Sequence, residues 1–241
     1  MNAVVMRLAA HALLGRRRIW LLVGLAGLLI IVAMLTRWGS GGNPATTATM
    51  MVNFGLGLLL PVMCLLVGTG VIAPEIEDGS VVYLLAKPLR RSTIALSKLA
   101  VAQVVALVFT VVPVVLGTLI AGDTDGELAV ALAVAAALAS VTYVSVFFAI
   151  AILSSNPTIV GLLYAVLWEG SLAGYVPGVR TLSVRQWALA PAEEMLEGNV
   201  VVNVNSDVSI AVGTVLIIAV VLASFAFAVR RLARLNVRVA E

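Results

Sequence analysis

The sequence has little charge. Only 11% of its 241 residues are Asp, Glu, Lys or Arg, whereas about 25% are charged in an average soluble domain. Hydrophobic residues make up 62% of the chain and form several long apolar runs. This composition excludes an ordinary soluble domain and indicates an all-α integral membrane protein.

Histidine and cysteine are nearly absent. His11 and Cys64 are each the only residue of their type, which excludes a disulfide within the chain and a metal site built from a His and Cys cluster. The chain also lacks the Gly-x-x-x-x-Gly-Lys-Ser/Thr phosphate loop, a Gly-x-Ser-x-Gly elbow and a His-Glu-x-x-His pair. We therefore expect no ATP hydrolysis or other catalysis by this chain, and no cofactor bound to it.

Long apolar segments predict the transmembrane helices. A hydrocarbon core of about 30 Å needs about 20 helical residues, and six segments approach that length. The segment 1–18 before them holds Arg7 and Gly15–Arg18, which suits an amphipathic helix at the membrane surface; a disordered basic tail is the alternative, and a cleavable signal is not expected. The predicted spans, in a single domain covering 1–241, are 19–35, 51–72, 99–121, 128–153, 159–175 and 208–229.

Basic residues are distributed unevenly among the loops. With six spans and a cytoplasmic amino terminus, twelve of the fifteen Lys and Arg residues fall on the cytoplasmic side, and only Arg37, Arg180 and Arg185 fall outside. Cytoplasmic loops of membrane proteins carry an excess of Lys and Arg. This pattern predicts that both termini and the loop 73–98 are cytoplasmic and that 176–207 is extracytoplasmic. The basic inner face also suits anionic membrane lipids.

The loop 73–98 contains a defined order of polar and apolar residues. It begins with three acids and a glycine within 75–79, continues through a short amphipathic run, 80–86, and ends in Pro88 and several basic residues. Pro88 disfavours helix at the residue before it, so the run is expected to form one short helix and then break. Such a helix would lie on the membrane surface between two spans, where it can contact a partner in water.

Glu169 is an ionisable residue inside a predicted span. Charged side chains are costly in the bilayer, so an acid at this depth is a functional-site candidate by default. It would then take part in a substrate or proton path. The alternative, which we favour, is a structural role: a glutamate near the outer headgroups, packed between helices or paired with Arg180 or Arg185.

Two motifs resemble those of a known transporter family. The stretch Glu75–Lys98, with acids before Gly-Ser, a leucine-rich run, Lys-Pro, a basic pair and then Lys98, looks like the cytoplasmic loop of type-2 ABC exporter permeases. Trp168-Glu169-Gly170, followed by Pro-Gly-x-Arg and Leu-Ser-x-Arg in 177–185, is similar to a subgroup of bacterial permeases of this class. The loop 176–207 departs from the pattern, because it contains no clear apolar re-entrant helix.

The resemblance implies a permease subunit of an ABC exporter in the bacterial cytoplasmic membrane. Two permease chains, identical or paralogous, would sit on two ATP-binding subunits that hold ATP and Mg²⁺. The amphipathic run would dock in a groove of the ATPase as a coupling helix, with the acids before it paired to basic residues there; the alternative for these acids is a solvated loop. ATP-driven closure of the ATPases would then move the spans. The residues expected to bind the ATPase are Glu75, Glu77, Asp78, Gly79, Val82, Tyr83, Leu85, Pro88 and Arg90.

Other function classes fit the sequence less well. The main alternative is a secondary transporter or a membrane assembly protein with Glu169 as a functional acid, but secondary transporters are commonly built from paired repeats with broken helices, and no repeat is evident here. Nothing indicates a nucleic-acid partner. A substrate pathway through the spans would be lined by apolar and small hydroxyl residues, including Ser140, Thr142 and Ser145. The substrate class therefore stays open among amphipathic drugs, lipids and peptides.

Overall fold

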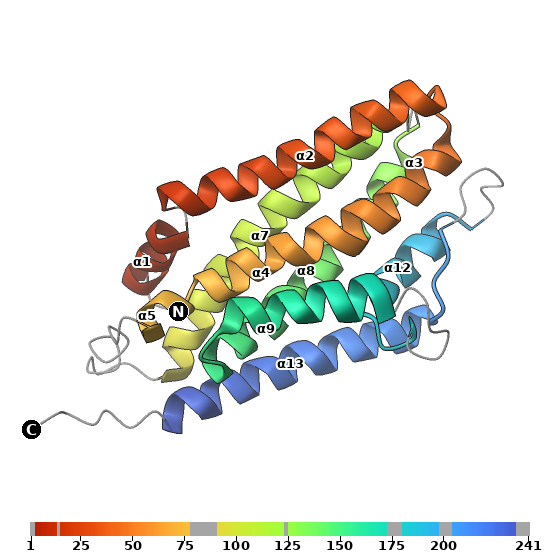
Figure 1. The fold of residues 1–241 in the computed structure, drawn as a ribbon. Coiled ribbons are helices and arrows are strands. Elements are labelled where there is room, and N and C mark those ends of the chain that lie inside the picture. Colours follow the sequence, from red (N-terminus) through yellow and green to blue (C-terminus); the bar gives the residue numbers. More distant parts are fainter. Residues whose placement is uncertain are drawn as a thin grey trace, which may run out of the picture.

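The computed structural model describes residues 3–13, 15–77, 91–122, 125–172, 180–197 and 204–234, and every regular element within these ranges is a helix (Figure 1). The expected all-α fold is thereby confirmed. The elements are α1 (Ala3–Leu13), α2 (Arg16–Ser40), α3 (Pro44–Met50), the π-helix η1 (Met51–Leu59), α4 (Leu60–Gly70), α5 (Ala73–Glu77), α7 (Arg91–Ala121), α8 (Glu127–Leu153), α9 (Pro157–Leu163), the π-helix η2 (Tyr164–Leu172), α12 (Val184–Met195) and α13 (Ile210–Arg234).

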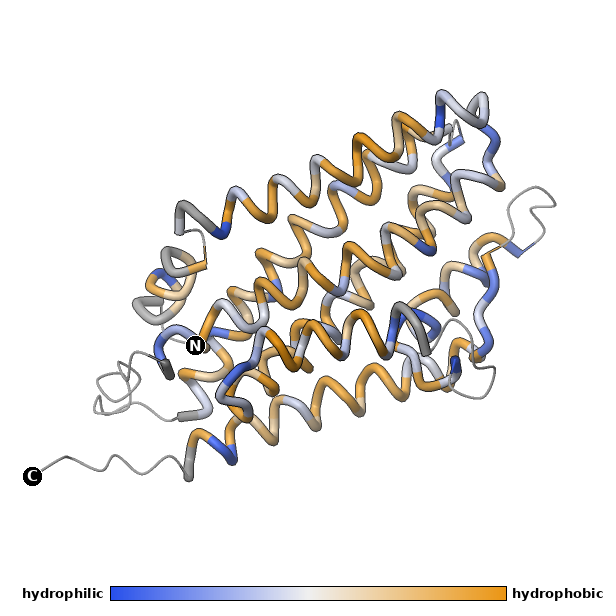
Figure 2. Tube along the Cα trace, in the orientation of Figure 1, coloured by the Kyte–Doolittle hydropathy of each residue, from blue (hydrophilic) through white to orange (hydrophobic). Residues whose placement is uncertain are grey.

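Five helical segments in the described part of the chain are long and apolar enough to cross a membrane. A helix rises about 1.5 Å per residue, so even the shorter ones exceed the hydrocarbon core of about 30 Å. Hydrophobic residues follow their lengths, and hydrophilic ones gather near the ends (Figure 2). The remaining predicted span, the fifth at 159–175, corresponds to a shorter apolar helix, Pro157–Glu169. The five long segments are Arg18–Ser40, Pro44–Glu75, Ser92–Ala121, Glu127–Leu153 and Ile210–Leu232.

The helix α8 forms the centre of the bundle. It contacts α7, α4, α12 and α13, and its many alanines allow these neighbours to approach closely. By contrast, α2 and α13 leave most of their apolar surface exposed, as expected for helices that face lipid. The helices run along a common direction: α1, α5 and the last turn of α13 lie at one end, and α3 and α12 lie at the other (Figure 1). We call these the α5 end and the α12 end.

The contact between α4 and α8 depends on a glycine. A Cβ atom at Gly68 would lie 2.8 Å from the Cβ of Phe147 and 3.1 Å from the carbonyl oxygen of Val144, so only glycine permits this spacing without movement of a neighbour. Phe147 in turn stacks on Tyr143 and meets Tyr164 edge-on, with ring centroids 6.1 and 6.0 Å apart. The chain's single cysteine, in α4, is fully buried in the same core.

Hydroxyl and amide side chains join α7 to α8 inside the bundle. The hydroxyls of Thr110 and Ser140 lie 2.7 Å apart, and the amide nitrogen of Gln103 donates to the carbonyl oxygen of Val141 and to the hydroxyl of Ser145. Such bonds hold membrane helices together where water is absent. Ser140 and Ser145 are therefore engaged between helices in this structure, although the sequence offered them as lining for a substrate pathway.

The loop predicted at 176–207 contains a helix that the sequence did not indicate. Most side chains of α12 are buried, and α12 packs against α8 and α13. A Cβ at Gly213 of α13 would lie 3.0 Å from the carbonyl oxygen of Trp187, so the two backbones are close. The hydroxyl of Ser206 donates to the carbonyl of Gln186, and the amide of Ser206 donates to the carboxylate of Glu193. The described residues of this region, 180–197 and 204–207, are thus an integral part of the bundle.

Candidate functional site

Glu169 lies buried at the α12 end, on the π-helix η2. Only 1% of the residue is exposed. Its carboxylate accepts a hydrogen bond from the hydroxyl of Ser183 at 2.5 Å and another from the backbone N–H of Val184 at 2.9 Å. The hydroxyl of Tyr164 is a more distant donor, at 3.4 Å. Both carboxylate oxygens therefore have partners within the chain.

The partners of Glu169 form the start of α12. Ser183 is the residue before the helix, and its side chain does not cap its own helix. The first N–H groups of a helix have no partner within the helix, and the aligned peptide dipoles make this end positive. Glu169 supplies the missing acceptor and the complementary charge from a different segment. The result is a helix cap across the bundle, and it fastens α12 to η2.

The two arginines that the sequence offered as partners of Glu169 bind elsewhere. The guanidinium of Arg180 lies 3.7 Å from the carboxylate of Asp207. Arg185 donates to the side-chain oxygen of Asn53 at 3.4 Å, and it fits beside Gly57, where a Cβ would lie 2.6 Å from its Nη1 atom. Arg185 thus links α12 to η1, while Glu169 links α12 to η2.

This geometry favours the structural interpretation of Glu169. In this structure the carboxylate is enclosed, and each of its oxygens accepts a hydrogen bond from within the chain. The arrangement can position α12, and it offers no vacant oxygen for a ligand. Among the described residues, no three His, Cys, Asp or Glu side chains come together as they would for a metal ion.

A second polar cluster lies at the α5 end, around Lys98. This lysine of α7 has only 2% of its side chain exposed. Its ammonium group donates to the carboxylate of Glu75 at 2.6 Å and to the carbonyl oxygen of Val71 at 2.9 Å. The guanidinium of Arg18, from α2, donates to the carbonyl of Gly70. Two basic side chains from two helices therefore contact the end of α4.

Only part of the predicted ATPase-binding set falls on described residues. Glu75 does, and it forms the ion pair with Lys98. Glu77 is the last residue of α5, and its side chain lies outside the described part. From the sequence we placed Lys98 among the basic residues at the end of the loop 73–98 and named no partner for it, because lysines at the ends of membrane helices usually extend to the interface. The predicted residues outside the described ranges are Asp78, Gly79, Val82, Tyr83, Leu85, Pro88 and Arg90.

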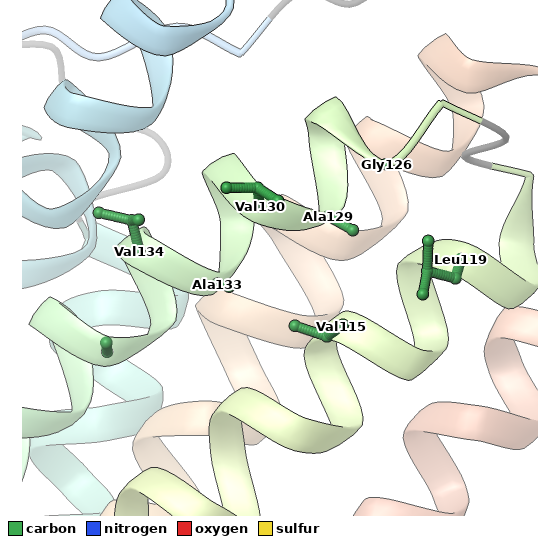
Figure 3. A pocket seen from close by; sticks show the side chains of 8 residues that line it. Val115, Leu119, Gly126, Ala129, Val130, Ala133 and Val134 are labelled. Atoms are coloured by element: carbon green, nitrogen blue, oxygen red, sulfur yellow. The ribbon is translucent and has the colours of Figure 1, made fainter.

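An apolar groove lies between α7 and α8 in the half of the bundle nearer the α12 end (Figure 3). Its volume is about 500 Å³, and apart from Gly126 it is lined by aliphatic side chains, among them Val115, Leu119 and Val130. Ligand sites that select a substrate usually combine such a surface with a few placed polar groups. This groove has almost none, so it carries no recognition chemistry of its own.

Comparison with protein families decides the class of this chain. A family described as "ABC-2 family transporter protein" matches residues 14–176, which is more than half of the sequence. The chain belongs to the ABC-2 transporter family. The resemblance to permeases of type-2 ABC transporters that we drew from Glu75–Lys98 is thereby confirmed. No curated protein matches the chain.

The ABC-2 match includes all of the cluster around Lys98 and only part of the cluster around Glu169. It runs from the end of α1 through η2, so it includes the ion pair of Glu75 and Lys98 as well as Glu169 itself. It ends before Ser183 and Val184, which bind Glu169. ABC-2 membership also supports a multi-pass protein of the inner membrane and a transport component without catalytic activity of its own.

Proposed function

We propose that this chain is the permease subunit of an ABC exporter and that it couples transport to ATP hydrolysis by separate ATP-binding subunits. Membership in the ABC-2 family carries this proposal. It is supported by the position of α5 and of the first turn of α7, which flank the predicted coupling run 80–86 in the chain and lie at the end of the bundle where α1 and the carboxyl end of α13 also lie (Figure 1). Two permease chains and two ATPase subunits would form the complete transporter.

We further propose six spans with both termini in the cytoplasm. The continuous helix formed by α9 and η2, with 7 and 9 residues respectively, supplies the fifth of these spans, predicted at 159–175. Sixteen residues rise about 24 Å, close to the thickness of a thin hydrocarbon core. With six spans the two ends of the chain share one side, which agrees with the placement of α1 and the last turn of α13 at the α5 end (Figure 1). The α5 end is also the side to which the sequence assigns twelve of the fifteen Lys and Arg residues, as expected for the cytoplasmic side.

The experiment that tests this function is an affinity purification of the chain from its native membranes in mild detergent, with an ATP analogue present. We expect an ATP-binding subunit to be recovered in a ratio of about one to one, as in a complex of two permeases and two ATPases. Recovery of the chain with no nucleotide-binding partner would contradict the proposal and would favour a secondary transporter or an assembly protein.

Reversing the charge of Glu77 tests the contact with the ATPase. We expect Glu77→Lys to weaken recovery of the ATP-binding subunit by about tenfold, because a like charge placed against basic residues opposes docking. Glu75 is less suitable for this test, because its reversal would also place a cation beside buried Lys98. The matched control is Glu197→Lys, which reverses an exposed acid near the α12 end. Equal recovery with Glu77→Lys and wild type would show that this acid does not contact the ATPase.

A further inference from the structure

We propose that Lys98 is a positioning residue for coupling: it fastens α5 to α7, so that a push on the segment between these helices moves both of their spans as one unit. The inference rests on the proposed function, and it concerns a residue outside the predicted docking set. Lys98 itself touches no ATPase in this scheme. It acts through the two helices that it joins.

The geometry places Lys98 at the junction of three chain segments. Its ammonium group contacts Glu75 of α5 at 2.6 Å and the carbonyl of Val71 at 2.9 Å, while its own backbone belongs to α7. Arg18 from α2 donates to the neighbouring carbonyl of Gly70. Carbonyls at the end of a helix carry the negative pole of its dipole and attract cations. The end of α4 is therefore held from two sides by basic side chains.

The ion pair of Glu75 and Lys98 links the two ends of the segment through which the ATPase would exert force on the bundle. Residues 78–90, which include the predicted coupling run 80–86, connect the end of α5 to the start of α7 in the chain. Glu75 lies three residues before this segment, and Lys98 lies eight residues after it. Their ion pair therefore closes the loop at its base and joins the two points where force from the segment enters the bundle.

Burial makes this connection stiff. The side chain of Lys98 is 2% exposed and that of Glu75 is 28% exposed, and the neighbouring residues Ile94, Ala95 and Ala102 are buried. Separating two opposite charges in surroundings of low dielectric constant is far more costly than separating them in water. Movement of α5 away from α7 is thus opposed by the pair, whereas movement of both helices together leaves it intact.

The test uses three variants of the full chain, each purified with its ATP-binding subunit. Lys98→Met and Glu75→Gln each leave one partner of the pair alone, whereas the double variant removes both charges. Neutralising a whole buried pair commonly costs less stability than breaking it. We therefore expect the double variant to regain the thermal stability that Lys98→Met loses. Because Glu75 also belongs to the predicted ATPase-binding set, the amount of ATPase recovered with each variant is measured first, with Glu75→Gln alone showing how far loss of this carboxylate weakens docking. The readout for coupling is the rate of ATP hydrolysis of the complex relative to that of the ATPase subunit alone.

Measured per bound ATP-binding subunit, so that weaker docking through Glu75 does not enter, the permease-dependent change in ATP hydrolysis is expected to fall at least threefold in the double variant although its thermal stability returns. A merely structural pair would restore hydrolysis together with stability, and that result would overturn the inference. The matched control is Arg37→Met. Arg37 of α2 donates to the carbonyl of Ile120 near the end of α7 at 3.1 Å. This is an exposed contact of a basic side chain with a helix-end carbonyl at the opposite end of the bundle, and its removal should leave hydrolysis unchanged.

The failure of the inference can be told apart from the failure of the proposed function. If the wild-type chain binds no ATP-binding subunit, the proposed function is wrong. The inference about Lys98 is then also wrong, and this is known without comparing the variants. If the wild-type complex hydrolyses ATP in a permease-dependent manner and the double variant does so equally well, the proposed function stands and the role of Lys98 is wrong.

Discussion

Replacing Glu169 with alanine is expected to lower the free energy of unfolding by about 3 kcal/mol, since the hydroxyl of Ser183 and the N–H of Val184 would each lose their acceptor inside the bundle. A buried donor left without a partner costs about 1–3 kcal/mol, and bonds to a charged group are at the upper end of that range. The lost interaction between the carboxylate and the positive end of α12 adds to the effect.

Thermal unfolding of the purified chain in detergent measures this change. Glu169→Gln should fall between alanine and wild type, because the amide oxygen can still accept one of the two hydrogen bonds. Glu194→Ala is the matched control, as Glu194 is an exposed acid on α12 itself. If Glu169→Ala unfolded at the wild-type temperature, the cap would not stabilise α12.

The same variants separate the two interpretations of Glu169. If the residue only positions α12, the activity of Glu169→Gln per folded complex should equal that of wild type at temperatures where both are folded. If the acid carries protons or contacts a substrate, the glutamine variant should be inactive even where it is folded. The enclosed geometry leads us to expect the first result.

The second large effect is expected at Gly68. Gly68→Ala should destabilise the chain by about 2 kcal/mol, within the usual range for an added methyl group in a packed core. The new Cβ would meet the Cβ of Phe147 and the carbonyl oxygen of Val144, and neither atom is the free end of a flexible side chain. The helices α4 and α8 would have to move apart, and the stacking around Phe147 would be disturbed.

Gly24→Ala is the control for this prediction. Gly24 lies in α2, and a Cβ there would meet nothing within 4 Å. Alanine favours helix over glycine by about 1 kcal/mol, so this variant should be at least as stable as wild type when unfolding is followed by heat or denaturant. If Gly68→Ala and Gly24→Ala unfolded alike, close contact at Gly68 would not matter for the bundle.

Composition and apolar runs were sufficient to predict the membrane spans. Each of the five long segments overlaps a predicted span, because a run of about 20 apolar residues has few alternatives to a transmembrane helix. The helix α12 was not predicted, because it contains no such apolar run. Its sequence, Val184–Met195, mixes Arg185, Pro191 and two glutamates with apolar residues, and its burial comes from contact with α8 and α13, which local sequence does not reveal.

The sequence alone identified Glu169 as a candidate site residue, but it did not identify the groups that bind its carboxylate. Glu169 stood out as an acid inside a span, and the nearby arginines were natural candidates to pair with it by charge alone. Its actual partner is the amino-terminal end of a helix, and that partner exists only once α12 has formed. Lys98 illustrates the same limit, because its carboxylate partner, Glu75, lies 23 residues away along the chain.

The fully buried cysteine of α4 makes this protein suitable for labelling experiments without prior engineering. Thiol reagents in water do not reach Cys64, so the natural chain serves as its own unlabelled background. A cysteine introduced at Ser155, between α8 and α9, would mark the α5 end, and one at Glu197 would mark the α12 end; both positions are exposed. An impermeant maleimide added to intact cells would then reveal which end of the bundle faces outward.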